Sequence, residues 1–243
     1  MMNHALIFAG GTGRRMNTAD KPKQFLELYG KPIIIYTIEH FERHPEIDNI
    51  LVVCLESYIE ELWRLLDKFA IKKVSKIVPG GDGADKSIYN GLQALECVCK
   101  NDDIVLIHDG VRPLINSRLI SENIDSVKKY GNAISIEPAS ESVVHISSKD
   151  NIVSVPPRSE VFSVKAPQAF RFSDIWDLHK RAQRDSIRTT DSAHLCSIYG
   201  VEMHFVKSSP CNIKITMPQD YYIFRALFEA MENRQLKQMD EVF

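Results

Sequence analysis

The chain has few cysteines, and none forms the spaced pair that binds a metal or carries a redox reaction. Its five cysteines are odd in number, and no Cys-x-x-Cys pair occurs. This usage is typical of reduced, mostly buried thiols, so we expect a cytoplasmic protein without disulfides. The eight histidines contain no His-Glu-x-x-His pattern, and we expect no zinc site.

Long apolar runs and an excess of one charge are also missing. No apolar run approaches the ~20 residues of a membrane span, and the run at 5–9 is too short for the core of a signal peptide. The 30 Lys and Arg residues face 32 Asp and Glu residues, giving a net charge of −2. We therefore expect neither a membrane nor a nucleic acid as partner. A chain of 243 residues is long enough for one large α/β domain, and we predict a single domain over 1–243.

The sequence does have a glycine-rich loop behind that short apolar run. Glycines at 10, 11 and 13 allow backbone N–H groups to approach a phosphate closely. The third glycine of the dinucleotide fingerprint is replaced by Met16, and no Gly-Lys-Ser/Thr follows the loop. An ordinary turn with solvated charges is the alternative. A polyanion site is favoured because one acid, Asp20, stands among four cations: Arg14, Arg15, Lys21 and Lys23.

Apolar runs alternate with stretches of helical period along most of the chain. The runs indicate strands that are buried on both faces, near 4–9, 49–55, 74–78, 103–108, 132–137 and 201–206. The helical stretches lie near 32–43, 57–69, 85–99, 117–129, 173–184 and 218–232. This alternation predicts an α/β fold with a Rossmann-like, doubly wound and mostly parallel sheet. Ligands of such sheets bind at the carboxyl ends of the strands, where the glycine-rich loop would lie.

The segment from about 137 to 170 breaks this alternation. It has no helical period, and its short β-like runs are rich in valine and isoleucine. The turn-prone residues 147–151 interrupt the runs. We predict a β-hairpin arm inserted into the domain. Its exposed-looking apolar residues fit either a local subdomain or a dimerisation arm, and the pattern alone leaves both open.

Three further segments carry polar residues at positions where a site could form. Asp109 follows an apolar run and could ligate Mg²⁺ or cap a turn. The glycines before Ser87 could approach a base or form a plain loop with Asp85 as a helix cap. Lys214 lies in a β-like run at 212–216, where it points either into a site or to solvent. Thr190 and Asp191 stand where a helix would begin, and capping is their simple role.

Taken together, these segments resemble the cytidylyltransferases that act on acyclic polyol phosphates. The matching pieces come in the family's order over about 9–220. They are residues 9–16 (AGGTGRRM), 21–25 (KPKQF), 80–82 (GGD), 87 (S), 108–113 (HDGVRP), 167–170 (PQAF), 190–193 (TDSA) and 212–216 (NIKIT). The resemblance implies a nucleotidyltransferase that uses CTP as co-substrate and Mg²⁺ as cofactor, and a homodimer joined by the arm.

The resemblance also implies roles for individual residues. The catalytic residues would be Arg15, Lys23 and Lys214, which hold the triphosphate and stabilise charge at the α-phosphorus. The nucleotide would contact Ala9, Gly10, Gly11, Thr12, Gly13, Gly81, Asp82, Ser87 and Asp109. Asp109 would also be the metal ligand. The acceptor would contact Arg112, Ser142, Thr190, Asp191 and, from the neighbouring subunit's arm, Arg158.

The chain departs from the family pattern mainly on the acceptor side. Ala84 stands where an arginine is frequent, with Lys86 as a candidate replacement, and Ser142 and Ala166 replace threonines. The likeness of residues 9–13 and 31–33 favours ribitol 5-phosphate as acceptor, with 2-C-methyl-D-erythritol 4-phosphate as the alternative. A sugar-1-phosphate nucleotidyltransferase and a non-catalytic CTP-binding protein are further alternatives.

Overall fold

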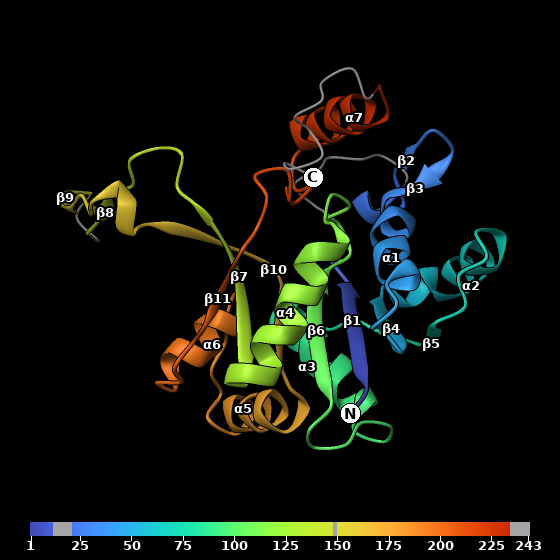
Figure 1. Cartoon of the computed structure of the whole chain (residues 1–243), viewed down its shortest axis with the longest axis horizontal. Helices are drawn as coiled ribbons and strands as arrows, with labels where there is room; N and C mark the ends of the chain where they lie inside the picture. Colours follow the sequence, from blue (N-terminus) through green and yellow to red (C-terminus); the bar gives the residue numbers. More distant parts are fainter. Residues whose placement is uncertain (12–20, 148–149, 234–243) are drawn as a thin grey trace.

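A seven-stranded sheet forms the centre of the molecule in the computed structural model, which describes residues 1–11, 21–147 and 150–233 (Figure 1). The strand order is β11-β7-β10-β6-β1-β4-β5, and β10 runs antiparallel to its two neighbours while the other pairs are parallel. The strands are β1 (Asn3–Ala9), β4 (Asn49–Cys54), β5 (Val74–Pro79), β6 (Ile104–Asp109), β7 (Asn132–Pro138), β10 (Phe162–Arg171) and β11 (Phe205–Lys207).

Helices cover both faces of this sheet. The helices are α1 (Ile33–Arg43), α2 (Ile59–Lys68), α3 (Ala84–Leu95), α4 (Ser117–Tyr130), α5 (Phe172–Arg184), α6 (Ser192–Ile198) and α7 (Pro218–Asn233). Alternate side chains of β1 enter opposite cores, because successive residues of a strand point to opposite faces. Ile7 packs with α1, α2 and α4, and Leu6 packs with α3, α5 and α6. The predicted doubly wound α/β fold is confirmed.

The parallel register brings the carboxyl ends of the strands to one edge. Phe8 of β1 lies opposite Asp109 of β6, and Ala9 lies opposite Cys54 of β4. The glycine loop after β1, the Asp109 turn after β6 and the loop after β5 therefore meet at this edge. Helix α7 packs above it through Phe224, which is fully buried beside Ile215 and Tyr36.

The predicted arm at 137–170 is too long, because its second half belongs to the sheet. Residues Phe162–Arg171 form β10, which pairs with β7 and β6, and pairing with β7 reaches Phe162 opposite Pro138. The buried stretch 166–170 fills the position between β6 and β7. Only residues 139–161 leave the sheet, and they carry the small pair β8 (His145–Ile146) and β9 (Ile152–Ser154), which projects away from the body (Figure 1).

Several smaller expectations differ from the structure. The strand expected at 201–206 forms only over β11, the helix expected at 85–99 ends at Leu95, and residues 212–216 form no strand. A small pair, β2 (Glu27–Leu28) and β3 (Lys31–Pro32), was not predicted. In the described parts of the chain, the helices are all too short or too polar to cross a membrane.

Candidate active site

A cavity of about 200 Å³ opens at the carboxyl edge of the sheet. Five chain segments that are distant in sequence meet in its walls: the loop after β1, residues 23–24, the start of α3, the Asp109 turn, and Lys214. Its lining is Phe8, Ala9, Gly10, Gly11, Lys23, Gln24, Gly83, Ala84, Ser87, Asp109, Val111 and Lys214. Five of the predicted nucleotide-binding residues thus line one cavity together with Lys23 and Lys214, while Thr12, Gly13 and Arg15 lie outside the described residues.

The walls of this cavity come together through a backbone contact between two glycines. A Cβ atom on Gly10 would lie 2.9 Å from the Cα of Gly80 and 2.9 Å from the Oγ of Ser87. A Cβ on Gly80 would lie 2.7 Å from the Cα of Gly10. Contacts below 3.0 Å cannot be kept without a shift of the backbone, so the approach of the two loops requires glycine at both positions.

Ser87 holds the turn that follows Gly80. Its Oγ accepts a hydrogen bond from the Gly81 amide at 3.1 Å and donates one to the Gly83 carbonyl at 2.8 Å. The turn needs glycine at 83, because its φ of +114° lies in the left-handed half of conformational space. Gly81 and Ser87 thus meet at this turn, whereas Asp82 lines a neighbouring cavity.

Asp109 is buried between two cations. Its Oδ1 lies 2.6 Å from Nζ of Lys214, and its Oδ2 accepts a hydrogen bond from Nε of Arg112 at 2.7 Å. Burial alone would raise the pKa of Asp109, but the charges of Arg112 and Lys214 outweigh it and hold that pKa well below its ordinary value. The carboxylate is therefore ionised, and it binds both Lys214, which lines this cavity, and Arg112 beside it.

The segment 212–216 is held against the site by polar contacts rather than by a sheet. Nζ of Lys23 donates to the Ile215 carbonyl at 3.0 Å, and Nη1 of Arg112 donates to the Asn212 carbonyl at 3.0 Å. The Asn212 side chain is fully buried and donates to the carbonyl of Ala166. Lys214 consequently points at Asp109 although its segment is not a strand.

A second, smaller cavity of about 70 Å³ shares Asp109 and Lys214 with the first. Its other polar lining residues are Arg112, Lys165, Gln168, Thr190, Asp191 and Ser192. Asp191 also accepts a hydrogen bond from the His194 amide, which caps α6 as expected. Three of the predicted acceptor residues therefore gather here. The other two, Ser142 and Arg158, lie exposed on the arm and line neither cavity.

Two buried amides were missed as site residues. Gln24 donates to the carbonyls of Ala9 and Gly11 at 2.7 and 3.2 Å, and thereby supports the glycine loop. Gln168 accepts from the Ala193 amide at 2.8 Å and ties β10 to α6. Both lie within the motifs noted above, but an amide has no charge or spacing that would mark it as a site residue.

His108 is neutral, since burial lowers its pKa to about 3.

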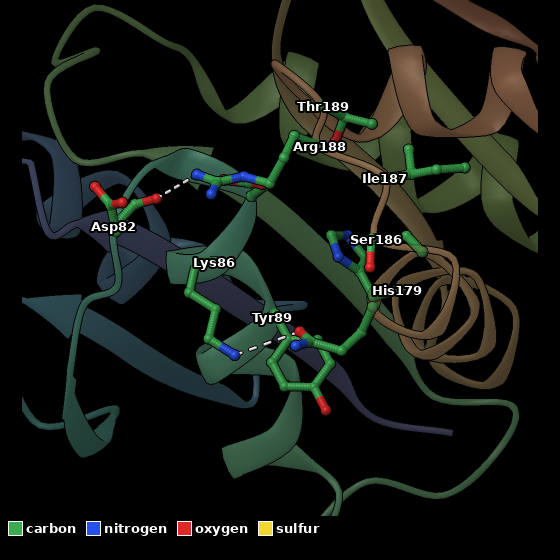
Figure 2. Close-up of a pocket in the computed structure, with 11 residues that line it drawn as sticks. Asp82, Lys86, Tyr89, His179, Ser186, Ile187, Arg188 and Thr189 are labelled. Carbon is green, nitrogen blue, oxygen red and sulfur yellow. Dashed lines mark hydrogen bonds and ion pairs between the residues drawn. The ribbon is translucent and has the colours of Figure 1, made fainter.

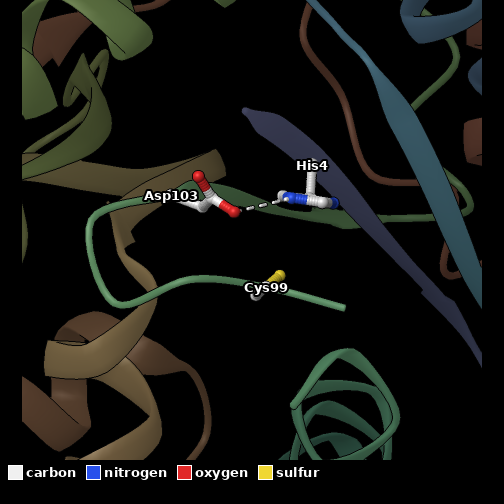
Figure 3. Close-up of side chains that lie close together, drawn as sticks. All are labelled: His4, Cys99 and Asp103. Carbon is white, nitrogen blue, oxygen red and sulfur yellow. Dashed lines mark ion pairs between the residues drawn. The ribbon is translucent and has the colours of Figure 1, made fainter. Parts of the chain in front are cut away.

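A different cluster lies at the opposite, amino-terminal edge of the strands (Figure 3). His4, Cys99 and Asp103 each offer one potential metal ligand, and the three atoms lie within 4.8 Å of one another. The search for a local histidine motif missed this cluster, because its three residues are not part of one contiguous motif. The Asp103 carboxylate accepts from the amides of Met2 and Lys100 at 2.7 and 2.9 Å. These bonds explain the cluster as an anchor for the starts of β1 and β6.

The fold and site define a nucleotidyltransferase of the α/β class, with glycine turns and two lysines around a cavity at the carboxyl edge of a parallel sheet. The sequence pattern of the IspD family, 2-C-methyl-D-erythritol 4-phosphate cytidylyltransferase, matches residues 3–230. The chain belongs to this family.

Two activities occur among the named relatives of the chain. A ribitol-5-phosphate cytidylyltransferase of Vibrio parahaemolyticus is 47% identical, over 97% of this chain and 99% of the relative. A 2-C-methyl-D-erythritol 4-phosphate cytidylyltransferase of Clostridium botulinum is 38% identical, over 94% and 98%. The crystal structure of 4-diphosphocytidyl-2C-methyl-D-erythritol synthase from Anaerococcus prevotii superimposes with a TM-score of 0.82 at 25% identity, over 94% of this chain and 96% of that one.

The glycine contact predicts opposite effects of alanine at two adjacent positions. Gly10→Ala places a methyl group against Gly80 and Ser87 and should lower the free energy of unfolding by about 1–3 kcal/mol. Gly11→Ala meets nothing within 4 Å and should be neutral or slightly stabilising, because alanine restricts the unfolded chain. Urea unfolding of both variants measures this difference. Equal stabilities would show that the two loops do not touch as described.

Proposed function

We propose that this protein transfers CMP from CTP to an acyclic polyol phosphate, with release of pyrophosphate, and that ribitol 5-phosphate is the acceptor. The observation that carries this proposal is the position of Lys214 and Asp109 in the wall shared by the two cavities. A reaction between two anionic substrates needs cations at the point where they meet. The larger cavity suits the nucleotide, and the smaller one suits the reacting end of the acceptor.

The larger cavity has the groups that a cytidine triphosphate requires. Backbone amides of Gly10 and Gly11 can approach phosphate oxygens, and the ammonium of Lys23 lies in the same wall. The turn held by Ser87 offers backbone groups to the edge of the base. Arg15 belongs to the same proposal through the family motif, outside the described residues.

The proposed reaction needs no covalent intermediate with the enzyme. A phosphate oxygen of the acceptor attacks the α-phosphorus in line and forms a new P–O bond. The bond from the α-phosphorus to the oxygen that bridges it to the β-phosphorus breaks, and its electron pair leaves with pyrophosphate. Catalysis then consists of positioning and charge stabilisation, in which Lys214 faces the α-phosphate and Lys23 faces the outer phosphates.

Mg²⁺ fits this site as an ion carried mainly by the triphosphate. The Asp109 carboxylate has about four lone-pair positions, and Lys214 and Arg112 occupy one on each oxygen. One carboxylate is therefore still able to ligate a cation, in keeping with the preference of Mg²⁺ for one or two carboxylates together with phosphate oxygens. When bound, the ion would neutralise charge on the phosphates.

One feature supports ribitol 5-phosphate over methylerythritol phosphate. The 47% identical relative carries the ribitol activity in its name, whereas the relative named for methylerythritol phosphate is 38% identical. Lys165, which lines the smaller cavity and pairs with Glu137 at 2.5 Å, can donate to a hydroxyl group of either polyol phosphate.

The proposal includes a homodimer in which the arm completes the partner's acceptor site. Apolar side chains of the arm are strongly exposed, with Ile146 at 62%, Ile152 at 64% and Val153 at 67%. A patch of this kind is typical of a protein interface. Ser142 and Arg158 lie on the same arm, away from the cavities of their own chain, so a partner's site is the place where they could act.

An assay of pyrophosphate release tests the proposed function. Purified protein with CTP and Mg²⁺ should release pyrophosphate with ribitol 5-phosphate and much more slowly with 2-C-methyl-D-erythritol 4-phosphate. A preference for the second acceptor would reverse the assignment of substrate. Turnover of UTP or dTTP with a sugar 1-phosphate, or CTP binding without turnover, would favour the alternative classes.

Removal of either cavity lysine should abolish most turnover while the fold persists. Lys23→Ala and Lys214→Ala each remove a preorganised positive charge, and each should lower kcat by about 10²–10³-fold. Lys72→Ala is the matched control, because Lys72 is exposed just before β5, at the far edge of the sheet. Circular dichroism checks the fold of each variant. Near-normal rates for both cavity variants would contradict the proposed roles.

The arm predicts a dimer whose sites can be complemented. Ile146 and Ile152 are cross-strand partners, so replacing both by aspartate should give a monomer of 27.7 kDa in sedimentation velocity, with little activity. Arg158→Ala and Lys214→Ala should each be inactive. When the two variants exchange subunits at random, half of the dimers contain one subunit of each variant, and one of the two sites in such a dimer has both residues intact. About a quarter of all sites should therefore regain activity. A mixture that stays inactive would place Arg158 outside the partner's site.

A further inference from the structure

Arg188 lies on the loop between α5 and α6 and reaches across to the turn before α3 (Figure 2). Its Nη2 donates to the Asp82 carbonyl at 2.5 Å. Its Nε lies 2.5 Å from Oδ2 of Asp85, and its Nη2 lies 3.3 Å from Oδ1 of the same carboxylate. One guanidinium thus binds a backbone carbonyl and both oxygens of a carboxylate, a geometry that lysine cannot reproduce.

The turn that Arg188 binds is the one proposed to face the base. Residues 81–83 are held from one side by Ser87, and Arg188 holds them from the other. The guanidinium also fills the space beside the glycine at 83, since a Cβ there would lie 2.9 Å from its Nη2. The N-cap residue of the following helix α3 is Gly83, so no side chain caps this helix. Arg188 therefore supplies an outside restraint on a turn whose glycines would otherwise leave it loose.

Arg188 also lies close to the position where the family pattern has an arginine and this chain has Ala84. Lys86, the candidate replacement, points elsewhere: its Nζ lies 4.4 Å from the centre of the Tyr89 ring and bonds Gln183 at 3.3 Å (Figure 2). It lines the neighbouring 410 Å³ cavity and is absent from the lining of the larger site cavity. Arg188 binds the same turn from a loop about one hundred positions further along the chain.

The loop that carries Arg188 continues directly into the acceptor side of the site. Thr190 and Asp191 follow two and three residues later and line the smaller cavity. The contacts of Arg188 therefore join the base-side turn at 81–83 to the acceptor-side loop at 189–191. A ligand that orders one of these segments lowers the entropic cost of ordering the other, which is the condition for coupled binding.

We infer that Arg188 is a positioning residue that couples CTP binding to acceptor binding, an inference that rests on the proposed function. A nucleotide on the base-side turn would stabilise the arrangement in which Asp85 and the Asp82 carbonyl bind Arg188. Arg188 then holds Thr190 and Asp191 in place for the acceptor. The reverse effect follows by reciprocity, since binding energies at two linked sites are coupled equally in both directions.

Calorimetry on the full-length protein tests this inference. The affinity for ribitol 5-phosphate is measured with and without a non-cleavable CTP analogue that has a methylene group between the α- and β-phosphorus, in the presence of Mg²⁺. We expect the wild type to bind ribitol 5-phosphate at least about fivefold more tightly with the analogue present. Arg188→Ala should bring this ratio close to one.

Steady-state kinetics provide a second readout that a purely structural role would not produce. Arg188→Ala should raise KM for CTP about tenfold, the loss expected for a charge-assisted hydrogen bond, with kcat within about threefold of wild type. The KM of Arg188→Lys for CTP should lie between those of the wild type and Arg188→Ala, because lysine keeps the charge but loses the bidentate contact. Arg184→Ala, an exposed arginine at the end of α5, is the matched control and should behave as wild type.

The outcomes distinguish a failure of the proposed function from a failure of the inference about Arg188. A wild type that neither binds the analogue nor releases pyrophosphate contradicts the proposed function itself. A wild type that turns over but shows no coupling overturns the inference alone, as does an Arg188→Ala variant with an unchanged affinity ratio and unchanged KM. A loss of thermal stability without a change in coupling would also overturn it, because Arg188 would then support only the fold.

Discussion

The site depends on one buried carboxylate that must be paired. Asp109 lies at the end of a strand whose residues are all buried, where an isolated negative charge would be costly. Arg112 from the next turn and Lys214 from a segment more than one hundred positions away meet that requirement. The Lys214 contact ties the 212–216 segment to Asp109, and it brings the Lys214 ammonium to the wall shared by two cavities.

Sheet topology explains why so many separate loops reach this carboxylate. The strands β1, β4 and β6 run parallel and in register, so their following loops emerge at one edge. The close contact of Gly10 with Gly80 then brings the loops after β1 and β5 together. Larger side chains at either glycine would separate the two walls. The two glycines thus allow the walls to meet, and in the proposed function Gly10 would also open its backbone amide to a phosphate.

Local sequence pattern predicted most of the fold because most of the strands are continuous apolar runs of the kind that parallel sheets bury. It failed for β10, which begins with the exposed residues Phe162 and Val164 near the arm and contains Pro167 and Gln168. Only its antiparallel pairing with β6 and β7 makes it a strand of the core. The pattern likewise located Lys214 and Asp109 but not their contact, and it gave no reason to single out Arg188. Arg188 and its partner Asp82 are 106 positions apart, so the fold and not the neighbouring sequence brings them together.

The two cations beside Asp109 differ in a way that suits different tasks. Arg112 is buried, and its guanidinium is also held by the Asn212 carbonyl, so it cannot move without leaving a buried charge unpaired. The side chain of Lys214 is 39% exposed and bonds Asp109 at the cavity wall. In the proposed reaction, Arg112 would keep the carboxylate paired while Lys214 faces a phosphate. A fixed arginine beside a more exposed lysine would then let the site offer a positive charge to a substrate without losing the interaction that holds it together.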